Sequence, residues 1–321
     1  MFLLLKTLFI ALFPVVALLF FIYFVDKYQK EPWSELLKAV AAGVLSALIA
    51  LVAVMGVGHF FPPTVGGSIG DAFLNAAIPE ELAKFFMLWL VLKSNRYFDE
   101  YFDGVVYAVC VGLGFAGLEN ILYLMGEEDF LAVGVARGVL SVPAHFLFAV
   151  AMGYYYALVH FNQELTSKQK TFYTICVIAV PVLLHGLFDT FLMVMNVSIQ
   201  QWNFALAGAC VLAFVALCIY MVIFAFRKCK KLLQTDKRMF DMLAQHQFNQ
   251  YWTPTPQNQQ QWEPSPQGPQ QQNPSPQGSQ QWNPSSPGPQ QWNPSPQGPQ
   301  QQNPSPQDPQ PNPPQDETPL K

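Results

Sequence analysis

The sequence predicts an all-α, polytopic membrane protein, a helical bundle of about seven transmembrane helices with a disordered C-terminal tail. Long apolar runs fill the chain up to about residue 226, and each run approaches the ~20 residues that a helix needs to cross ~30 Å of hydrocarbon. Only 12% of the 321 residues are charged, whereas soluble domains contain about a quarter. Beyond about residue 249 the aliphatic residues almost disappear, so the chain has two unlike parts.

The composition divides the chain into three segments. Residues 1–230 form a multi-pass membrane domain, residues 231–250 a cytoplasmic juxtamembrane helix or linker, and residues 251–321 a Pro/Gln-rich tail. A ten-residue unit recurs five times in the tail, beginning with "QWEPSPQGPQ". Such a segment buries too little apolar surface to fold. We therefore expect a disordered tail that serves as a spacer or as the contact site of a cytoplasmic partner.

Seven apolar runs are candidate membrane spans: 7–25, 37–60, 73–92, 104–125, 130–160, 172–194 and 204–226. The basic residues of the connections follow spans one, three, five and seven: Lys27, Lys30, Lys38, Lys93, Arg96, Lys168, Lys170, Arg227, Lys228, Lys230 and Lys231. The other connections contain no Lys or Arg. Because Lys and Arg mark the cytoplasmic side, this pattern predicts a cell-membrane protein with its N-terminus outside and its C-terminus in the cytoplasm.

The fifth span, 130–160, is too long for one straight crossing. We expect a short interfacial or re-entrant piece before Pro143 and one crossing after it, because irregular backbone at membrane depth must be buried in protein or line a wet cavity. The alternative, two crossings divided at Pro143, would turn the basic C-terminal segment outward.

The charge and the cysteines exclude some partners. The formal net charge of −4 is small and predicts no nucleic-acid partner, which leaves the lipid bilayer as the main surroundings of the chain. The five cysteines contain no CxxC pair and lie in or beside apolar runs, so no disulfide framework is expected.

Ionisable and polar residues interrupt four of the apolar runs. They are Glu80, Glu81 and Lys84, then Glu119 and Asn120, then Arg137 and His145, and finally His185 and Asp189. A charge near the bilayer centre costs at least ~2.5–3.5 kcal/mol, so such residues usually have a function. With the orientation above, the acids and imidazoles lie ~6–14 Å below the outer face at 1.5 Å per residue. This shared depth predicts one site in the outer half of the membrane.

The residue types at this depth suit hydrolysis. Neighbouring helix residues point ~100° apart, so one of Glu80 and Glu81 can face a cavity while the other pairs with Lys84. A cavity carboxylate suits a general base that acts on water. Asp189 lies four residues after His185 and can fix the tautomer of its imidazole, which could then stabilise an oxyanion. Arg137 is interpreted as an interfacial anchor whose side chain snorkels outward.

Other interpretations of these residues stay open. Glu80, Glu81 and Lys84 could form a neutralised structural ion pair, and the two histidines could make packing hydrogen bonds. The same buried acids and histidines could also belong to a proton-coupled transporter, although the membrane part shows no internal repeat of the kind that many transporters have. A third alternative is a non-catalytic membrane scaffold.

Four stretches together resemble the PrsW family of intramembrane proteases, relatives of the type II CAAX prenyl endopeptidases. They are "PEELAKF", "FDGVVYAVCVGLGFAGLENILY", "RGVLSVPAHF" and "HGLFD". The zinc-protease motif HExxH, the GxGD motif of aspartyl intramembrane proteases and a GxSG-type serine are absent from the sequence. The resemblance implies that residues 1–230 are a protease domain.

The resemblance also implies a substrate and residue roles. The substrate would be a membrane-anchored anti-sigma factor, or a similar single-span protein, cut at site one on its extracytoplasmic side. The catalytic residues would be Glu80, Glu81, Glu119, His145 and His185, with Glu80 activating the water. Lys84, Asn120, Arg137 and Asp189 would support them. The mechanism stays open between a metal-free one and a zinc-assisted one, in which Glu80, Glu119, His145 and His185 could ligate the metal.

Overall fold

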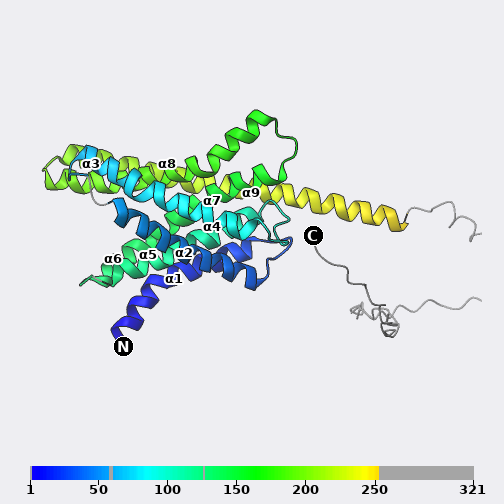
Figure 1. The fold of residues 1–321 in the computed structure, drawn as a ribbon, viewed down its shortest axis with the longest axis horizontal. Coiled ribbons are helices and arrows are strands. Elements are labelled where there is room, and N and C mark those ends of the chain that lie inside the picture. The colour runs from blue at the N-terminus through cyan, green and yellow to red at the C-terminus, as the bar shows by residue number, and fades with distance from the viewer. Residues whose placement is uncertain (1, 58–60, 126, 253–321) are drawn as a thin grey trace, which may run out of the picture. The chain divides into compact units, whose positions relative to one another are not determined.

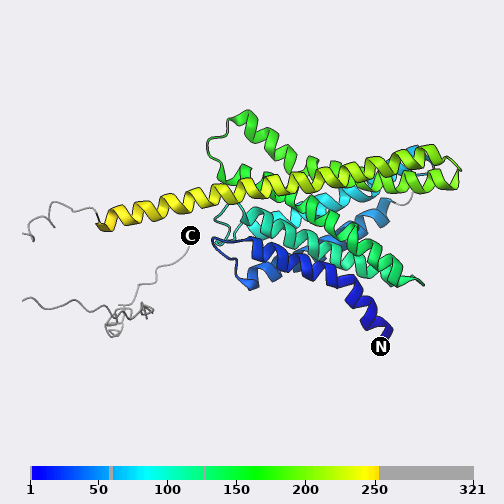
Figure 2. The ribbon, with the colours of Figure 1, turned by 180° about the vertical axis from the view of Figure 1, so that it is seen from behind.

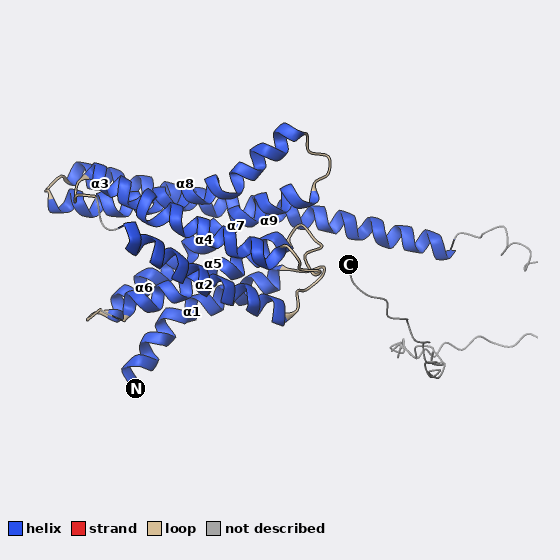
Figure 3. Ribbon diagram, in the orientation of Figure 1, coloured by secondary structure: helices blue, strands red, loops and turns tan. Residues whose placement is uncertain are grey.

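The computed structural model describes residues 2–57, 61–125 and 127–252, and the described residues contain helices and loops but no strand (Figure 1, Figure 3). The elements are α1 (Phe2–Val25), α2 (Trp33–Val57), α3 (Val65–Gly70), the π-helix η1 (Asp71–Ala77), α4 (Ile78–Leu92), α5 (Asp103–Leu124), α6 (Phe130–Val139), α7 (Ser141–Phe161), α8 (Ser167–Gln200) and α9 (Phe204–Trp252). The predicted all-α bundle is confirmed. Of the predicted tail, residues 253–321 lie outside the described residues.

Six stretches of the described chain are long and apolar enough to cross a membrane, against the seven predicted: 5–25, 33–56, 103–124, 130–161, 167–200 and 204–249. The third predicted span, 73–92, is missing from this set. Its residues are helical, but the helix is divided into η1 and α4, and the longer of the two has 15 residues. The division falls between Ala77 and Ile78, just before Pro79 and Glu80.

The long fifth span is broken as the proline predicts. α6 ends at Val139 and α7 begins at Ser141, two residues before Pro143. The first turn of a helix has no intrahelical partner for its N–H groups, so proline is tolerated there. The break turns α6 into a separate short helix that carries Arg137 back toward the end of α5.

Helix α5 is the centre of the bundle and packs between α2 and α7. Every residue from Asp103 to Gly117 is buried. Glycine makes the crossing with α2 possible, because a Cβ at Gly114 would overlap the carbonyl oxygen of Val40. On the α7 side, a Cβ at Gly112 would lie 2.7 Å from the Cβ of Ala149. Close backbone approach of this kind is how membrane helices pack without a hydrophobic driving force.

Helix α9 continues well beyond membrane length. It runs for 49 residues without interruption and extends past the ends of the neighbouring helices (Figure 2). The segment 231–250 therefore belongs to one continuous helix. Asp236 fixes this extension to the bundle, since its carboxylate accepts the backbone N–H groups of Tyr101 and Phe102 at 2.9 Å each. These donors lie at the N-terminus of α5, where the helix dipole favours an anion.

More carboxyl groups are buried at this end of the bundle, in the loops before α2 and α5. Asp26, Glu31 and Glu100 are each at most 8% exposed. The hydroxyl of Tyr107 donates a hydrogen bond to Glu31. Burial raises the pKa of Glu31 and Glu100 to about 7 and that of Asp26 to about 6. The protonated forms of these groups are therefore favoured by folding.

We expect the Glu31→Gln variant to lose part of the pH dependence of stability. The unfolded chain releases the Glu31 proton near pH 4.5 and the folded chain near pH 7. This stabilising contribution is present below pH 4.5 and is lost as the pH rises to 7, by roughly 1–3 kcal/mol. Melting temperatures of the purified protein between pH 5 and pH 8 measure it, with Glu35→Gln as the matched control. Parallel curves for wild type and Glu31→Gln would contradict the assignment.

Candidate active site

The structure joins all nine predicted site residues into one network within the bundle. α4 supplies Glu80, Glu81 and Lys84, α5 supplies Glu119 and Asn120, α6 supplies Arg137, α7 supplies His145, and α8 supplies His185 and Asp189. The contacts among them run without a gap from Asn120 at one end to Asp189 at the other. The residues predicted from four separate apolar runs thus form one physical cluster.

The ammonium group of Lys84 is the centre of this network. Its Nζ donates to Glu81 Oε1 at 2.7 Å and to His145 Nδ1 at 3.1 Å, and it lies 3.3 Å from Glu80 Oε2. The ring of Phe115 lies beneath it, with 3.8 Å from Nζ to the ring centroid. A buried ammonium group is tolerable only when it is paired and hydrogen-bonded. Lys84 therefore holds α4 against α5 and α7.

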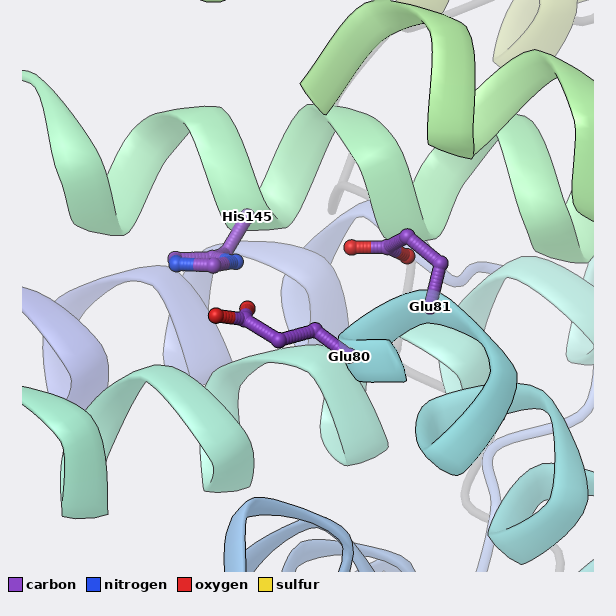
Figure 4. Close-up of side chains that lie close together, drawn as sticks. All are labelled: Glu80, Glu81 and His145. Carbon is purple, nitrogen blue, oxygen red and sulfur yellow. The ribbon is translucent and has the colours of Figure 1, made fainter. Parts of the chain in front are cut away.

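Glu80 and Glu81 have different surroundings, although both contact Lys84. Glu81 is 0% exposed, and besides Lys84 it contacts His185 Nδ1 at 2.9 Å. The side chain of Glu80 keeps 15% of its exposure and faces open space. Figure 4 shows both carboxylates directed from α4 toward α7, with the His145 ring beside Glu80. One of the two glutamates was expected to face a cavity and the other to be paired. Glu80 is the one that faces open space, and Glu81 is the buried, paired one.

The hydrogen bonds of His145 define its tautomer. Its Nδ1 faces the Lys84 ammonium group, which can only donate, so Nδ1 must accept. Its Nε2 then carries the proton and donates to Glu119 Oε2 at 2.8 Å. His145 is thereby fixed as a neutral ring between a cation and an anion.

His185 has a carboxylate at each ring nitrogen. Nδ1 lies 2.9 Å from Glu81 Oε1, and Nε2 lies 3.2 Å from Asp189 Oδ2 and 3.9 Å from Glu80 Oε2. The ring stacks on Phe148, with centroids 4.9 Å apart and 16° between the planes. The contact with Asp189 is the one that the four-residue spacing predicts. Two carboxylates and an aromatic ring leave the imidazole little freedom to rotate.

The interpretation of Arg137 as an outward-pointing anchor is wrong. Its Nε donates to Asn120 Oδ1 at 2.7 Å, and its Nη2 lies 3.1 Å from Glu119 Oε2. The guanidinium group also covers the ring of Tyr123, 3.8 Å from its centroid. Because the chain breaks between α6 and α7, α6 can turn Arg137 inward, where Glu119 compensates its charge.

Two cavities are lined in part by the same two carboxylates, Glu80 and Glu119. One, of about 270 Å³, is lined by Glu80, Glu119, His145, His185 and Asp189, among others. The second, of about 420 Å³, lies between α2, η1 and α5 and also reaches Glu80 and Glu119. Both are lined by Tyr123 as well. Glu80 and Glu119 are thus open to a ligand from two directions.

Sequence reasoning missed three residues of these cavities: Asp71, Asn75 and Tyr123. Asn75 donates to Asp71 Oδ1 at 2.7 Å from within the π-helix, and both line the larger cavity. Residues four apart lie on one face of a helix, so the sequence offered two usable signals. Asn75 lies four residues after Asp71, just before Pro79, and Tyr123 lies four residues after Glu119. The π-helix itself has no simple sequence signature, although π-helical turns are frequent at functional sites.

Three of the network residues could hold a metal ion. Glu80, Glu81 and His145 each offer a ligand atom, and these atoms lie within 4.8 Å of one another. This group shares Glu80 and His145 with the set predicted from the sequence, and it has Glu81 in place of Glu119 and His185. Two carboxylates and an imidazole are donors that zinc accepts, and Glu81 Oε2 is buried without a hydrogen-bond partner. The donor set therefore fits a divalent cation, but Lys84 Nζ contacts all three residues.

We expect Lys84 and a metal ion to compete for these donors, so that Lys84→Met raises the affinity for zinc by at least about tenfold. Two like charges cannot share one set of buried ligands without strong repulsion. Metal retained by the purified protein after dialysis against graded zinc measures the effect, and Lys93→Met is the control at an exposed lysine. Equal retention by wild type and Lys84→Met would contradict the competition.

A multi-pass helical bundle that gathers carboxylates and imidazoles around cavities among its spans is the architecture of an intramembrane hydrolase. Residues 31–226 match the family model described as "PrsW family intramembrane metalloprotease". The chain is 34% identical over 196 residues to Protease PrsW of Geobacillus kaustophilus, covering 60% of this chain and 80% of that one. It is 32% identical over 223 residues to Protease PrsW of Bacillus subtilis, covering 68% and 91%.

A third relative, Protease PrsW of Clostridioides difficile, is 34% identical over 188 residues, or 58% of this chain and 78% of that one. No solved structure matches the chain. The chain belongs to the PrsW family of intramembrane proteases. It is a multi-pass membrane peptidase.

Proposed function

We propose that this peptidase cleaves a membrane-anchored, single-span protein such as an anti-sigma factor on its extracytoplasmic side, with Glu80 as the general base. One observation carries the proposal. Glu80 lines both cavities, whereas its neighbour Glu81 is fully buried against Lys84 and His185. A base must reach water and substrate, and of the two glutamates Glu80 is the one with open space before it.

In the proposed reaction, a water molecule in the smaller cavity attacks the scissile carbonyl carbon while the Glu80 carboxylate takes its proton. The oxyanion that forms shares the N–H of His185 Nε2 with Asp189 Oδ2, which lies 3.2 Å from that nitrogen. The C–N bond then breaks, and Glu80 gives its proton to the leaving amine. One water is consumed, and one carboxyl and one amino terminus are formed.

The other network residues position Glu80 and His185. Asp189 and Glu81 hold the His185 ring from its two nitrogens. Lys84 holds Glu80 in place and His145 holds Lys84 in turn, with Glu119 and Arg137 completing the chain of charges. A metal ion, where bound, would be held by Glu80, Glu81 and His145 and would polarise the scissile carbonyl.

The orientation of the loops supports cleavage near the outer face. The connections 61–72, 126–129 and 195–203 carry no Lys or Arg, which supports an orientation with the N-terminal end of α4 and the C-terminal end of α8 toward the outside. Glu80 lies in the first turn of α4, and Asp189 lies 11 residues, or ~17 Å, before the end of α8. A bond in the outer part of a spanning substrate is therefore within reach.

The proposal is tested by cleavage of a single-span, anti-sigma-like substrate by the full-length protein in liposomes. Fragment masses that place the cut in the outer half of the substrate's span or just outside it are expected. A cut in the inner half would overturn the assigned orientation, and no cleavage of any single-span substrate would overturn the proposed substrate class.

We expect Leu51→Trp to slow cleavage of the spanning substrate by at least about tenfold, because Leu51 lines the larger cavity between α2 and η1. An indole there would fill the space through which a substrate segment reaches Glu80. Leu48→Trp is the matched control, since it lies one turn earlier on α2 with similar exposure, 44% against 43%, and does not line that cavity. Initial rates in liposomes compare the two, and equal rates would exclude this path.

A further inference from the structure

A third cavity, remote from the acids, lies between α1, α7 and α9. Its volume is about 490 Å³, and its wall is apolar over most of its length, with Phe21, Phe146, Val222 and Ala225 among the lining residues. Along α9 it extends from Val222 to Lys237, which is ~22 Å at 1.5 Å per residue. Half the hydrocarbon thickness of a bilayer is ~15 Å. We call this cavity the α1–α9 groove.

The charged residues of the α1–α9 groove lie in the half that follows Cys229 along α9, and all are lysines. Lys27 follows the last turn of α1, while Lys230 and Lys237 lie on α9 about two turns apart. All three are exposed, and none forms an ion pair with any described residue. Tyr28 and Gln234 add polar groups in the same half. The groove therefore joins an apolar channel, ~12 Å long from Val222 to Lys230, to a half that carries three ammonium groups.

We propose that the α1–α9 groove binds one anionic phospholipid, with an acyl chain along Val222 and Phe146 and its phosphate at Lys27, Lys230 and Lys237. Charge complementarity selects this occupant. A zwitterionic lipid brings no net charge to the three ammonium groups, and an apolar helix brings no charge at all. Basic pockets between membrane helices are recognised sites of anionic head groups. The site is separate from the peptidase cavity and does not depend on how that cavity works.

Native mass spectrometry of the full-length protein tests the site with equimolar phosphatidylglycerol and phosphatidylcholine of identical acyl chains. We expect one phosphatidylglycerol to be retained over phosphatidylcholine by at least about tenfold. The triple variant Lys27→Gln/Lys230→Gln/Lys237→Gln should lose this preference. The triple variant Lys38→Gln/Lys93→Gln/Lys168→Gln removes three other exposed lysines on the same predicted side and should keep it. Equal loss in both variants would show unspecific attraction and overturn the proposal.

A photo-crosslinking amino acid at Val222 tests the apolar part of the groove independently. We expect a mass gain of one anionic phospholipid at this position. At Leu212, which is 75% exposed on the same helix and outside the groove, the adducts should follow the bulk lipid composition. A peptide adduct at Val222 would assign the groove to a protein segment, either from this chain, a second copy or a substrate, and would overturn the lipid assignment.

Discussion

Glu80→Gln is expected to lower the turnover number by about 10²–10⁴-fold while the protein stays folded. The substitution keeps the shape of the side chain and removes its capacity to take a proton from water, and a positioned general base contributes rate factors of this size. The side chain lies against a cavity and is the more distant of the two carboxylates from Lys84, at 3.3 Å. The melting temperature should therefore change little.

Glu81→Gln is the matched control, because it makes the same chemical change one residue away. Glu81 is fully buried and contacts both Lys84 and His185, so its loss leaves the buried ammonium group poorly compensated. Breaking a buried pair costs on the order of 3 kcal/mol. We expect a clearly lower melting temperature for Glu81→Gln. If Glu80→Gln keeps its rate, or if only Glu80→Gln loses stability, the two roles are assigned wrongly.

His185→Ala is expected to lower the turnover number by about 10²–10³-fold, the usual effect of removing one oxyanion donor. His185→Gln can still donate one hydrogen bond and should recover part of the rate. The substitution Asp189→Asn leaves His185 in place but removes the carboxylate at its Nε2, 3.2 Å away. It should lower the turnover number less than His185→Ala and alter the pH profile of turnover.

Kinetics with the same substrate separate these outcomes. A purely structural role for His185 would lower the melting temperatures of His185→Ala and His185→Gln alike, with no recovery of rate in the latter. An unchanged pH profile in Asp189→Asn would show that Asp189 does not act through the imidazole.

Most of the fold was predictable from the sequence, because the length of an apolar run indicates a membrane helix and a proline indicates where such a helix breaks. The break before Pro143 and the span at 172–194, which lies within α8, follow from these signals. The third span was harder, because its helix is interrupted by a π-helical segment whose wider turns leave no periodic signature in seven residues. Sequence length alone also could not show that α9 stays helical through residues 231–250, where Asp236 ties it to the N-terminus of α5.

The site was predictable as a set of residues but not as a set of contacts. Charges in apolar runs are costly, so each of the nine residues was visible. Which partner each one meets depends on helix rotation and on loop geometry, which the sequence does not give. Arg137 shows this best, since an arginine near a helix end looks like an interfacial anchor until the turn at Leu140 directs it onto Glu119. The sequence likewise did not show that Lys84 contacts Glu80, Glu81 and His145 together.

We propose above all that Glu80 activates the water that cleaves a spanning substrate. The most direct measurement is cleavage of a single-span substrate in liposomes by wild type, Glu80→Gln and Glu81→Gln, with fragments identified by mass and folding checked by melting temperature. We expect wild type to cut and folded Glu80→Gln to cut at least about 10²-fold more slowly. Cleavage by Glu80→Gln at the wild-type rate would contradict it.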